Sequence, residues 1–586
     1  MGIDNSEDAG DGDCSARLRR LLTGVSLSLL AAIAIEQFEF SSAFPLARKL
    51  MQTQDMPVLL STAVLLLLLT ALKLPVAWTD CSARLKRSTL AVPILAAFTV
   101  AALGTKFAAF DYALSRDEAM AVFDAKIIAG GHLLAPIPPE WRPYASALQP
   151  EFRLPIPGDV AWVSSYLPGN AAIRATLGFA FPGVIINAVL AVAALVALLG
   201  VARQMWPEHR DAAVIAVVLA ASSSQLLFMA MTPYAMSAHL ALNLIWLWLF
   251  LRDTPSAHAG ALAVGFLATG LHQFIFHPLF VAPFLLQLLA DRRWKLGGVY
   301  IACYAAIGLF WILYWQILLA SADIAPQAAT AMGGSYLASR ITSLLSYFSP
   351  YGLETMVQNL LRFAAWQNPM MLVLLVPGFA AAWRLGGTLR SLAGGIVLTL
   401  AAMFVLLPYQ DLGWGYRYVH GLIGNAALLA AGGWLELTPD RNPSSHRVAW
   451  GTVTATTAFA VLILLPIHGW QVRTQVAPYA LAQASIASDP ADAVVIDTIG
   501  IYYGNDLVRN DPYLTNRPLS FDISFLNEEL VRNLCTRFKL TVFHSADAAR
   551  FGIAGSDPNG HSEHVRLAAL RNFIESPACR DLLRGQ

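Results

Sequence analysis

The sequence predicts an α-helical polytopic membrane protein, with about thirteen transmembrane helices and a small α/β domain at the C-terminal end. Of its 586 residues, 56% are hydrophobic and only 13% are charged, which is far from the composition of a soluble globular protein. Many apolar runs approach the roughly 20 residues that a helix needs to cross a bilayer. The segment 470–586 is polar again and carries ordinary strand and helix patterns.

The N-terminal segment, 1–20, is predicted to be a cytoplasmic tail with a polar, acidic start. Arg17, Arg19 and Arg20 precede the apolar run 21–35. This order fits a retained signal anchor, and a cleaved signal peptide is the alternative. Either one leaves the topology of the later helices unchanged.

The apolar runs within 21–469 define the membrane domain. The expected spans are 21–35, 56–78, 89–110, 175–201, 212–229, 236–251, 258–271, 274–290, 296–319, 370–383, 391–409, 418–437 and 448–467. Cytoplasmic loops carry an excess of Lys and Arg. With the N-terminus inside, every inward loop is basic, for example the one that holds Arg292, Arg293 and Lys295. The segments 111–174, 321–369 and 470–586 then lie outside.

The segment 470–586 is predicted to be a soluble extracytoplasmic domain. The runs 493–497 and 539–544 resemble buried strands, and 527–537 and 564–574 resemble helices. Cys535 and Cys579 are the cysteines that this topology places outside. An oxidising compartment favours a disulfide between them, and two unpaired thiols are the alternative.

The outward loop 111–174 holds the main candidate for chemistry, the adjacent carboxylates Asp117 and Glu118. The apolar spacing that follows them predicts a short helix lying on the membrane surface. Carboxylates at this height can meet both a water-soluble acceptor and a lipid headgroup. The alternative is that they are ordinary acidic loop residues of a membrane protein.

Polar and aromatic residues concentrate at the outward ends of the predicted helices, and we expect them to line a substrate site. These residues are Tyr234, His239, His272, His277, Asp411, Trp414, Tyr416 and Tyr418. Ionisable groups at the membrane are costly and are therefore functional candidates. The alternatives are an interfacial aromatic belt and buried histidines with internal partners. The five-residue spacing of His272 and His277 is poor for metal ligation from one helix face.

Two cations are candidates for binding a phosphate. Arg417 lies at an outward helix start, against the positive-inside bias, and its planar guanidinium suits phosphate. The alternative for Arg417 is a structural ion pair with Asp411. Lys106 could be a second phosphate contact, or its side chain could extend to the interface without binding a ligand.

Several classes of function are not supported by the sequence. There is no Walker loop, no HExxH and no GxSxG motif. The formal net charge of +1 suggests no nucleic-acid partner.

The SRDEA motif after a membrane helix, the GYRY motif that opens a late helix and the soluble C-terminal domain together resemble the GT-C membrane glycosyltransferases. The similarity is to protein mannosyltransferases and the bacterial aminoarabinose transferase, over 89–467. It implies a GT-C-like fold, a location in the bacterial inner membrane and a sugar donor linked to a polyprenyl phosphate. The acceptor would be a glycan, a lipid or a protein. Two features depart from the family. Its late RY is often followed by a Pro-containing stretch, whereas this chain has RYVHG. Two spans precede the helix that leads into the outward loop, where the family usually has one or none.

The resemblance implies that Asp117 is the general base, with Glu118 beside it, while Arg417 is expected on the phosphate for the chemical reasons given above. A lipid phosphate is a good leaving group, so one carboxylate and one cation suffice for displacement with inversion. A divalent metal ion held by Asp117 or Glu118 is left open as a cofactor. The alternative functions are a transporter or flippase of lipid-linked glycans, a polysaccharide polymerase or ligase, and a non-catalytic scaffold.

Overall fold

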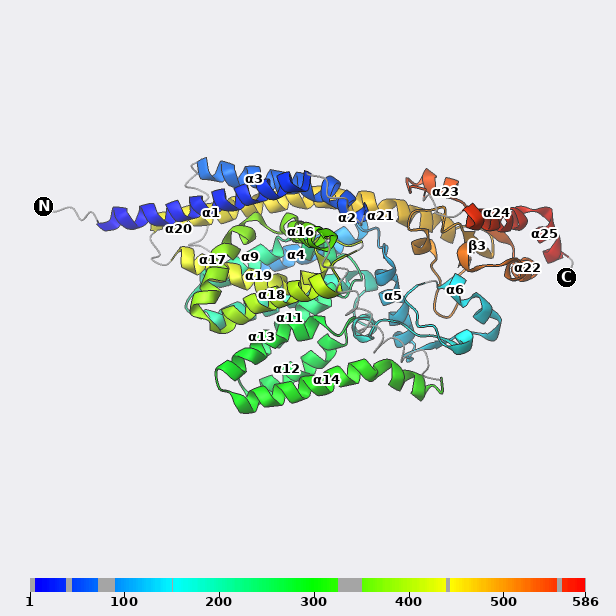
Figure 1. Cartoon of the computed structure of the whole chain (residues 1–586), viewed down its shortest axis with the longest axis horizontal. Coiled ribbons are helices and arrows are strands. Elements are labelled where there is room, and N and C mark those ends of the chain that lie inside the picture. The colour runs from blue at the N-terminus through cyan, green and yellow to red at the C-terminus, as the bar shows by residue number, and fades with distance from the viewer. Residues whose placement is uncertain are drawn as a thin grey trace.

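The computed structural model describes residues 6–37, 45–71, 90–149, 151–324, 350–410, 412–438, 443–555 and 561–584. Figure 1 shows a bundle of long helices with a smaller part, containing α22 to α25, at one end. The segment that contains α5 and α6 lies at the same end of the bundle, beside the C-terminal part. The predicted class, a polytopic helical membrane protein with an α/β C-terminal part, is confirmed.

The bundle is made of helices α1 to α4 and α7 to α21. Their bounds are α1 (Ser6–Gln37), α2 (Pro45–Leu50), α3 (Met56–Ala71), α4 (Ala91–Phe107), α7 (Gly169–Leu177), α8 (Ile186–Met205), α9 (Arg210–Ala221), α10 (Ser224–Met229), α11 (Met236–Phe250), α12 (Pro255–Thr269), α13 (Phe276–Ala290), α14 (Trp294–Ser321), α16 (Pro350–Ala365), α17 (Pro369–Leu385), α18 (Gly387–Leu406), η8 (Arg417–Leu422), α19 (Ile423–Leu437), α20 (Pro443–Phe459) and α21 (Leu465–Ala487).

Six helical runs in the described part of the chain are long and apolar enough to cross a membrane, or seven if one bent pair counts as a single span. The shorter apolar helices α4, α11 and α13 fall below that length. The expected count of about thirteen spans therefore remains a prediction.

Several predicted spans are broken in the structure. The run 175–201 divides into α7 and α8, with Pro182 in the intervening segment. The run 212–229 divides into α9 and α10, where the Ser223 side chain caps α10 by accepting a hydrogen bond from the backbone of Leu226. The segment 321–369, expected to be a loop, contains α16. The chain bends by 115° between α16 and α17. The breaks lie at local features, namely Pro182 before α8, the Ser223 cap of α10 and the Asn368 cap of α17, which an apolar pattern does not reveal.

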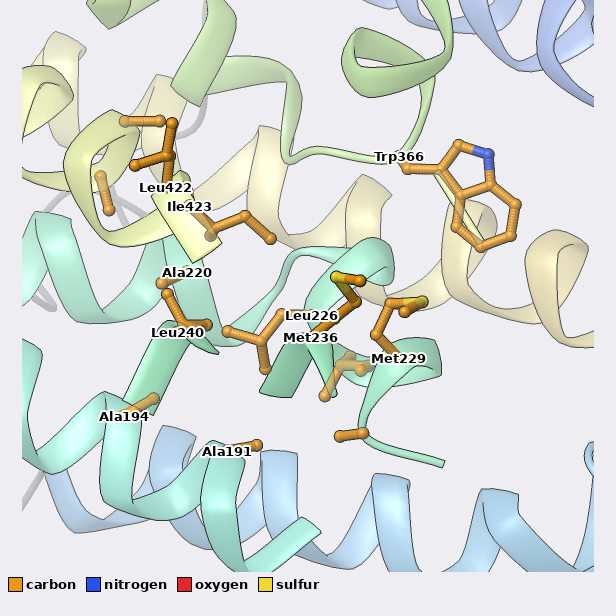
Figure 2. Packing of buried hydrophobic residues seen from close by; sticks show 14 of the residues in the cluster. Ala191, Ala194, Ala220, Leu226, Met229, Met236, Leu240, Trp366, Leu422 and Ile423 are labelled. Carbon is orange, nitrogen blue, oxygen red and sulfur yellow. The ribbon is translucent and has the colours of Figure 1, made fainter. Parts of the chain in front are cut away.

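Buried aliphatic side chains hold the middle of the bundle together. Figure 2 shows Ala191 and Ala194 of α8, Leu226 of α10 and Leu240 of α11 in one cluster. Small side chains on α8 allow the helix backbones to approach closely, as is common in membrane bundles. This packing fixes the helix ends on which the site is built.

The C-terminal part is a three-stranded parallel sheet with helices around it. The strands β3 (Ala493–Ile496), β4 (Leu519–Asp522) and β5 (Leu540–Phe543) have the order β4-β3-β5. The helices are α22 (Glu528–Arg537), α23 (Ser545–Arg550), α24 (His561–Glu575) and α25 (Pro577–Arg584). Cys535 and Cys579 form a disulfide with a Cα–Cα distance of 5.2 Å.

The structure differs from the sequence prediction in the surroundings of α5 (Arg116–Ala129). Its apolar residues Met120, Phe123 and Ile127 do not lie on a membrane surface. They join a core cluster with side chains of the C-terminal part, such as Phe521 and Leu534. The periodicity predicts the apolar face correctly, but it cannot distinguish a lipid partner from a protein one. The loop between α5 and α7 also contains β1 (Ala135–Pro136), α6 (Ala145–Leu148) and β2 (Ala161–Trp162).

Candidate functional site

Asp117 sits in the first turn of α5 because a capping box starts the helix at Ser115. The Ser115 hydroxyl accepts a hydrogen bond from the Glu118 backbone, and Glu118 Oε2 accepts one from the Ser115 backbone at 2.8 Å. These reciprocal bonds satisfy two backbone donors at the start of the helix. The position also places the Asp117 carboxylate at the positive end of the helix dipole.

Both carboxylate oxygens of Asp117 have donors. Oδ2 accepts a hydrogen bond from Arg417 Nη1 at 2.6 Å, and Oδ1 accepts one from the Tyr166 hydroxyl. Arg417 and Asp117 are largely buried, with exposed side-chain fractions of 8% and 15%. The two residues that the sequence singled out therefore meet, although 300 positions separate them.

Arg417 is held in place by aromatic rings and by backbone contacts. Its guanidinium carbon lies 5.2 Å from the ring centre of Tyr234 and 5.3 Å from that of Tyr418, both at cation–π distance. The Arg417 backbone N–H donates to Gln410 Oε1 at 2.9 Å. A Cβ atom at Gly413 would come within 3.0 Å of the Arg417 side chain, so the loop before Arg417 needs a glycine there.

His272 supports Tyr166 from the other side. The two rings stack with centres 4.2 Å apart. Burial lowers the pKa of His272 to about 4, with the charge of Asp117 opposing that shift. The ring is therefore neutral at physiological pH, and it acts as a platform for Tyr166 and not as a second cation.

The electrostatics of Asp117 favour its ionised form. Burial by itself would raise the pKa of the carboxyl group, but the charge of Arg417 and the hydrogen bonds from Tyr166 and Arg417 outweigh burial, so the pKa lies below its ordinary value. Burial and the adjacent Asp117 charge raise the pKa of Tyr166 far above its ordinary value. Tyr166 therefore remains a hydrogen-bond donor to Asp117.

These groups line a cavity of about 270 Å³. Its walls come from α5, the 151–170 segment, the start of α11, the 272–273 turn and the 412–418 segment. Tyr503, Asn505 and Asp506 of the C-terminal part complete it. The cavity is thus shared between the membrane bundle and the C-terminal part.

Arg116 fastens the C-terminal part to the cavity. Its Nη1 donates to the Val508 carbonyl at 2.9 Å, and its Nε lies 3.6 Å from Asp506 Oδ1. Arg509 reaches back and donates to the Ala113 carbonyl at 2.7 Å. These contacts involve residues just before Asp117 in the sequence, so the C-terminal part helps to position it.

Of the other residues predicted to line the site, Tyr234, His272 and Tyr418 are at the cavity. His239, His277, Trp414 and Tyr416 are buried in the protein and are not among the cavity-lining residues. His277 bridges Asn243 and Tyr304, with both contacts at 2.8 Å, and Trp414 stacks on Trp366. These are packing and internal hydrogen-bonding roles. Asp411 lies outside the described residues.

Lys106 and Glu118 are also away from the cavity. Lys106 is exposed at the end of α4, and Glu118 is buried beneath the helix start. Burial raises the pKa of Glu118 to about 7, against its hydrogen bonds with Ser115. We therefore propose a capping role for Glu118 in place of direct contact with a substrate.

Three contributors were missed by sequence reasoning: Tyr166, Glu151 and the 503–506 segment. Tyr166 lies in the same outward loop as Asp117 and belongs to the sequence SSYLPG, but an isolated tyrosine there gives no signal by itself. The 503–506 segment lies more than 380 positions after Asp117, and only the fold brings it there. Within the described residues, no three His, Cys, Asp or Glu side chains gather in a way that could hold a metal ion.

No protein-family model matches the chain, and no curated protein matches it. Among solved structures, the chain is similar to ArnT from Cupriavidus metallidurans bound to undecaprenyl phosphate, with 11% identity, a TM-score of 0.47, and coverage of 74% of this chain and 86% of that one. The apo structure of the same protein gives 12% identity, a TM-score of 0.43, and coverage of 76% and 90%.

Proposed function

We propose that the chain is an inverting glycosyltransferase that moves a sugar from a polyprenyl-phosphate donor to an acceptor hydroxyl. The observation that carries this proposal is the buried pair of Asp117 and Arg417 in a cavity at the junction of the bundle and the C-terminal part. A carboxylate and a guanidinium are the two groups that this displacement requires. The proposed location is the outer face of a bacterial inner membrane, because the basic loops of the sequence face the opposite side.

Arg417 is the proposed phosphate-binding residue. Its fork can hold two phosphate oxygens, and the surrounding tyrosine rings keep it oriented. In the structure Arg417 Nη1 donates to Asp117 Oδ2. A donor phosphate would compete for the guanidinium and release Oδ2 of Asp117.

Asp117 is the proposed general base. As the acceptor oxygen forms its bond to the anomeric carbon, Oδ2 takes the hydroxyl proton. The bond from that carbon to the phosphate oxygen breaks, and the polyprenyl phosphate leaves as an anion that Arg417 stabilises. Tyr166 keeps Oδ1 occupied, which directs the proton to Oδ2.

Binding of undecaprenyl phosphate to the full chain in nanodiscs tests the phosphate role. Arg417→Ala should weaken binding by roughly tenfold or more, since a hydrogen-bonded charge pair contributes about 1.5–3 kcal/mol. Arg417→Lys should restore only part of the affinity, because an ammonium group cannot form the bidentate contact. Arg532→Ala is the matched control, since Arg532 is an exposed arginine on α22, outside the cavity. Unchanged binding by Arg417→Ala would make the ion pair purely structural.

The same preparation separates the alternatives. Release of sugar from a polyprenyl-phosphate sugar is expected from a glycosyltransferase, and equally from a polymerase or ligase. A transporter or flippase would move the lipid without cleaving it.

A further inference from the structure

A second hollow opens on the C-terminal part, beside the cavity that holds Asp117. It has a volume of about 380 Å³ and lies where β3 and β4 end. Thr498 lies two residues after β3, Asp522 ends β4, and Ser524 and Phe525 lie two and three residues after Asp522. In open α/β sheets ligands bind outside the carboxyl ends of the strands. We refer to this hollow as the carboxyl-edge crevice.

The crevice and the Asp117 cavity share one wall, which consists of Glu151, Tyr503 and Asn505. Asn505 donates a hydrogen bond to Glu151, joining the outward loop to the C-terminal part. Tyr503 has φ 51° and ψ 36°, a left-handed conformation that is uncommon for residues other than glycine. Such strain persists only where the surroundings enforce it, and it clusters at ligand sites.

The chemistry of the lining favours a neutral, hydroxyl-rich ligand. The described lining holds the carboxylates Glu151 and Asp522 and contains no Lys, Arg or His, so it does not suit a phosphate or another anion. Asp522 is buried, and Oδ1 accepts hydrogen bonds from Thr498 and from the backbone and hydroxyl of Ser524. These bonds fix the carboxylate through one oxygen and do not use Oδ2.

Aromatic side chains accompany these polar groups. Tyr502, Tyr503 and Phe525 line the crevice, and the Phe525 side chain is 48% exposed. A large apolar ring exposed beside oriented carboxylate and amide groups can stack on the C–H face of a sugar while the oxygens accept its hydroxyl hydrogens.

We propose that the carboxyl-edge crevice is a carbohydrate-binding subsite that holds the acceptor next to Asp117. This proposal rests on the proposed glycosyltransferase function and specifies its acceptor as hydroxyl-rich. The shared wall would let an acceptor sugar in the crevice present a neighbouring hydroxyl group to the Asp117 cavity.

Saturation-transfer NMR on the full chain in nanodiscs tests the proposal, with the methyl glycosides of glucose, galactose, mannose and N-acetylglucosamine as probes at millimolar concentration. At least one probe should bind the parent protein. Phe525→Ala should weaken that binding roughly two- to tenfold, the range expected for loss of one aromatic stacking contact. Asp522→Asn should weaken it as well. Tyr513→Ala is the matched control, because Tyr513 is an exposed aromatic residue of the C-terminal part outside both hollows.

Undecaprenyl phosphate binding, measured in parallel, separates the two proposals. Normal lipid binding by Phe525→Ala shows that the variant is folded. The crevice proposal is wrong if the parent binds the lipid through Arg417 but binds none of the glycosides. It is also wrong if Phe525→Ala and Asp522→Asn bind the glycosides as well as the parent does. In both cases the proposed function stands. If the lipid does not bind at all, the proposed function is wrong, and the crevice proposal that rests on it is wrong as well.

Discussion

At the scale of single residues, the site is organised around two opposite charges that neutralise each other. Asp117 and Arg417 are both largely buried, and each would be costly to bury without the other. Their contact also keeps the carboxylate a weak base, because its pKa is held below the ordinary value. A donor phosphate that engages Arg417 would thus strengthen Asp117 as a base only when the substrate is present.

Asp117→Asn should lower sugar transfer by about 10²- to 10⁴-fold, the usual contribution of general-base catalysis. The amide keeps the shape of the side chain but cannot take the acceptor proton. Transfer is measured with purified protein, a polyprenyl-phosphate sugar and its acceptor, and a thermal unfolding curve checks the fold. Near-normal transfer by well-folded Asp117→Asn would rule out Asp117 as the base.

Tyr166→Phe should shift the pH profile without abolishing transfer. The Tyr166 hydroxyl is one of the groups that lower the pKa of Asp117. Its removal raises that pKa, and because the base must be deprotonated, the acidic limb of the profile should move to higher pH. The measurement is kcat/KM against pH for the parent and the variant. A uniform loss of rate with an unmoved limb would indicate a packing role only.

The sequence predicted both members of the central pair but not their contact: Arg417 was expected to bind a phosphate, with an ion pair to Asp411 as the alternative. Asp411 is near Arg417 in sequence, whereas Asp117 is 300 positions away. Sequence proximity was the only available guide, and long-range pairing depends on helix packing that residue patterns do not encode. For the same reason, histidines at apparent helix ends looked like site residues, although His239 and His277 are buried within the bundle.

At the scale of elements, α5 carries the site because both of its ends and its apolar face are fixed. Its N-terminus has a capping box, its C-terminus stops at Gly130, and its apolar face packs against the C-terminal part. The helix and its carboxylates could be predicted from the sequence. Its packing partner could not, since an amphipathic helix beside a membrane has two apolar environments available.

Glu118→Gln should change how stability depends on pH. The pKa of Glu118 is raised from 4.5 to about 7 in the folded protein, mainly by burial. Its protonated form is therefore favoured by folding, and its contribution to stability is complete below about pH 4.5 and is lost as the pH rises through about 7. The parent should lose thermal stability over this window relative to the glutamine variant. Parallel unfolding curves of the two proteins from pH 4 to pH 8 would contradict the assignment.

At the scale of the whole molecule, one helical run connects the bundle with the C-terminal part. It extends from His446 to Ala487, 42 residues, and passes through a short π-helical stretch, η9 (Ala460–Leu464). Gln471 contacts the bundle by donating to the Gln54 carbonyl at 3.1 Å, and Tyr479 contacts the C-terminal part by donating to the Tyr502 carbonyl at 2.7 Å. Figure 1 shows α21 passing from one part to the other.

A continuous helix fixes both the distance and the relative rotation of the two parts that it connects. Each residue of an α-helix adds about 1.5 Å of length and about 100° of rotation. Inserting one alanine between Gln471 and Tyr479, after Thr474, should therefore turn the C-terminal part out of register with α5 while leaving both parts folded. Sugar transfer by the purified protein should be lost after the insertion, and a thermal unfolding curve should show that the fold is kept. An alanine substituted for Thr474, which keeps the count, should preserve both. The number of residues in this helix, and not only their identity, is then a constraint on activity, so related chains should tolerate substitutions along it far better than insertions or deletions.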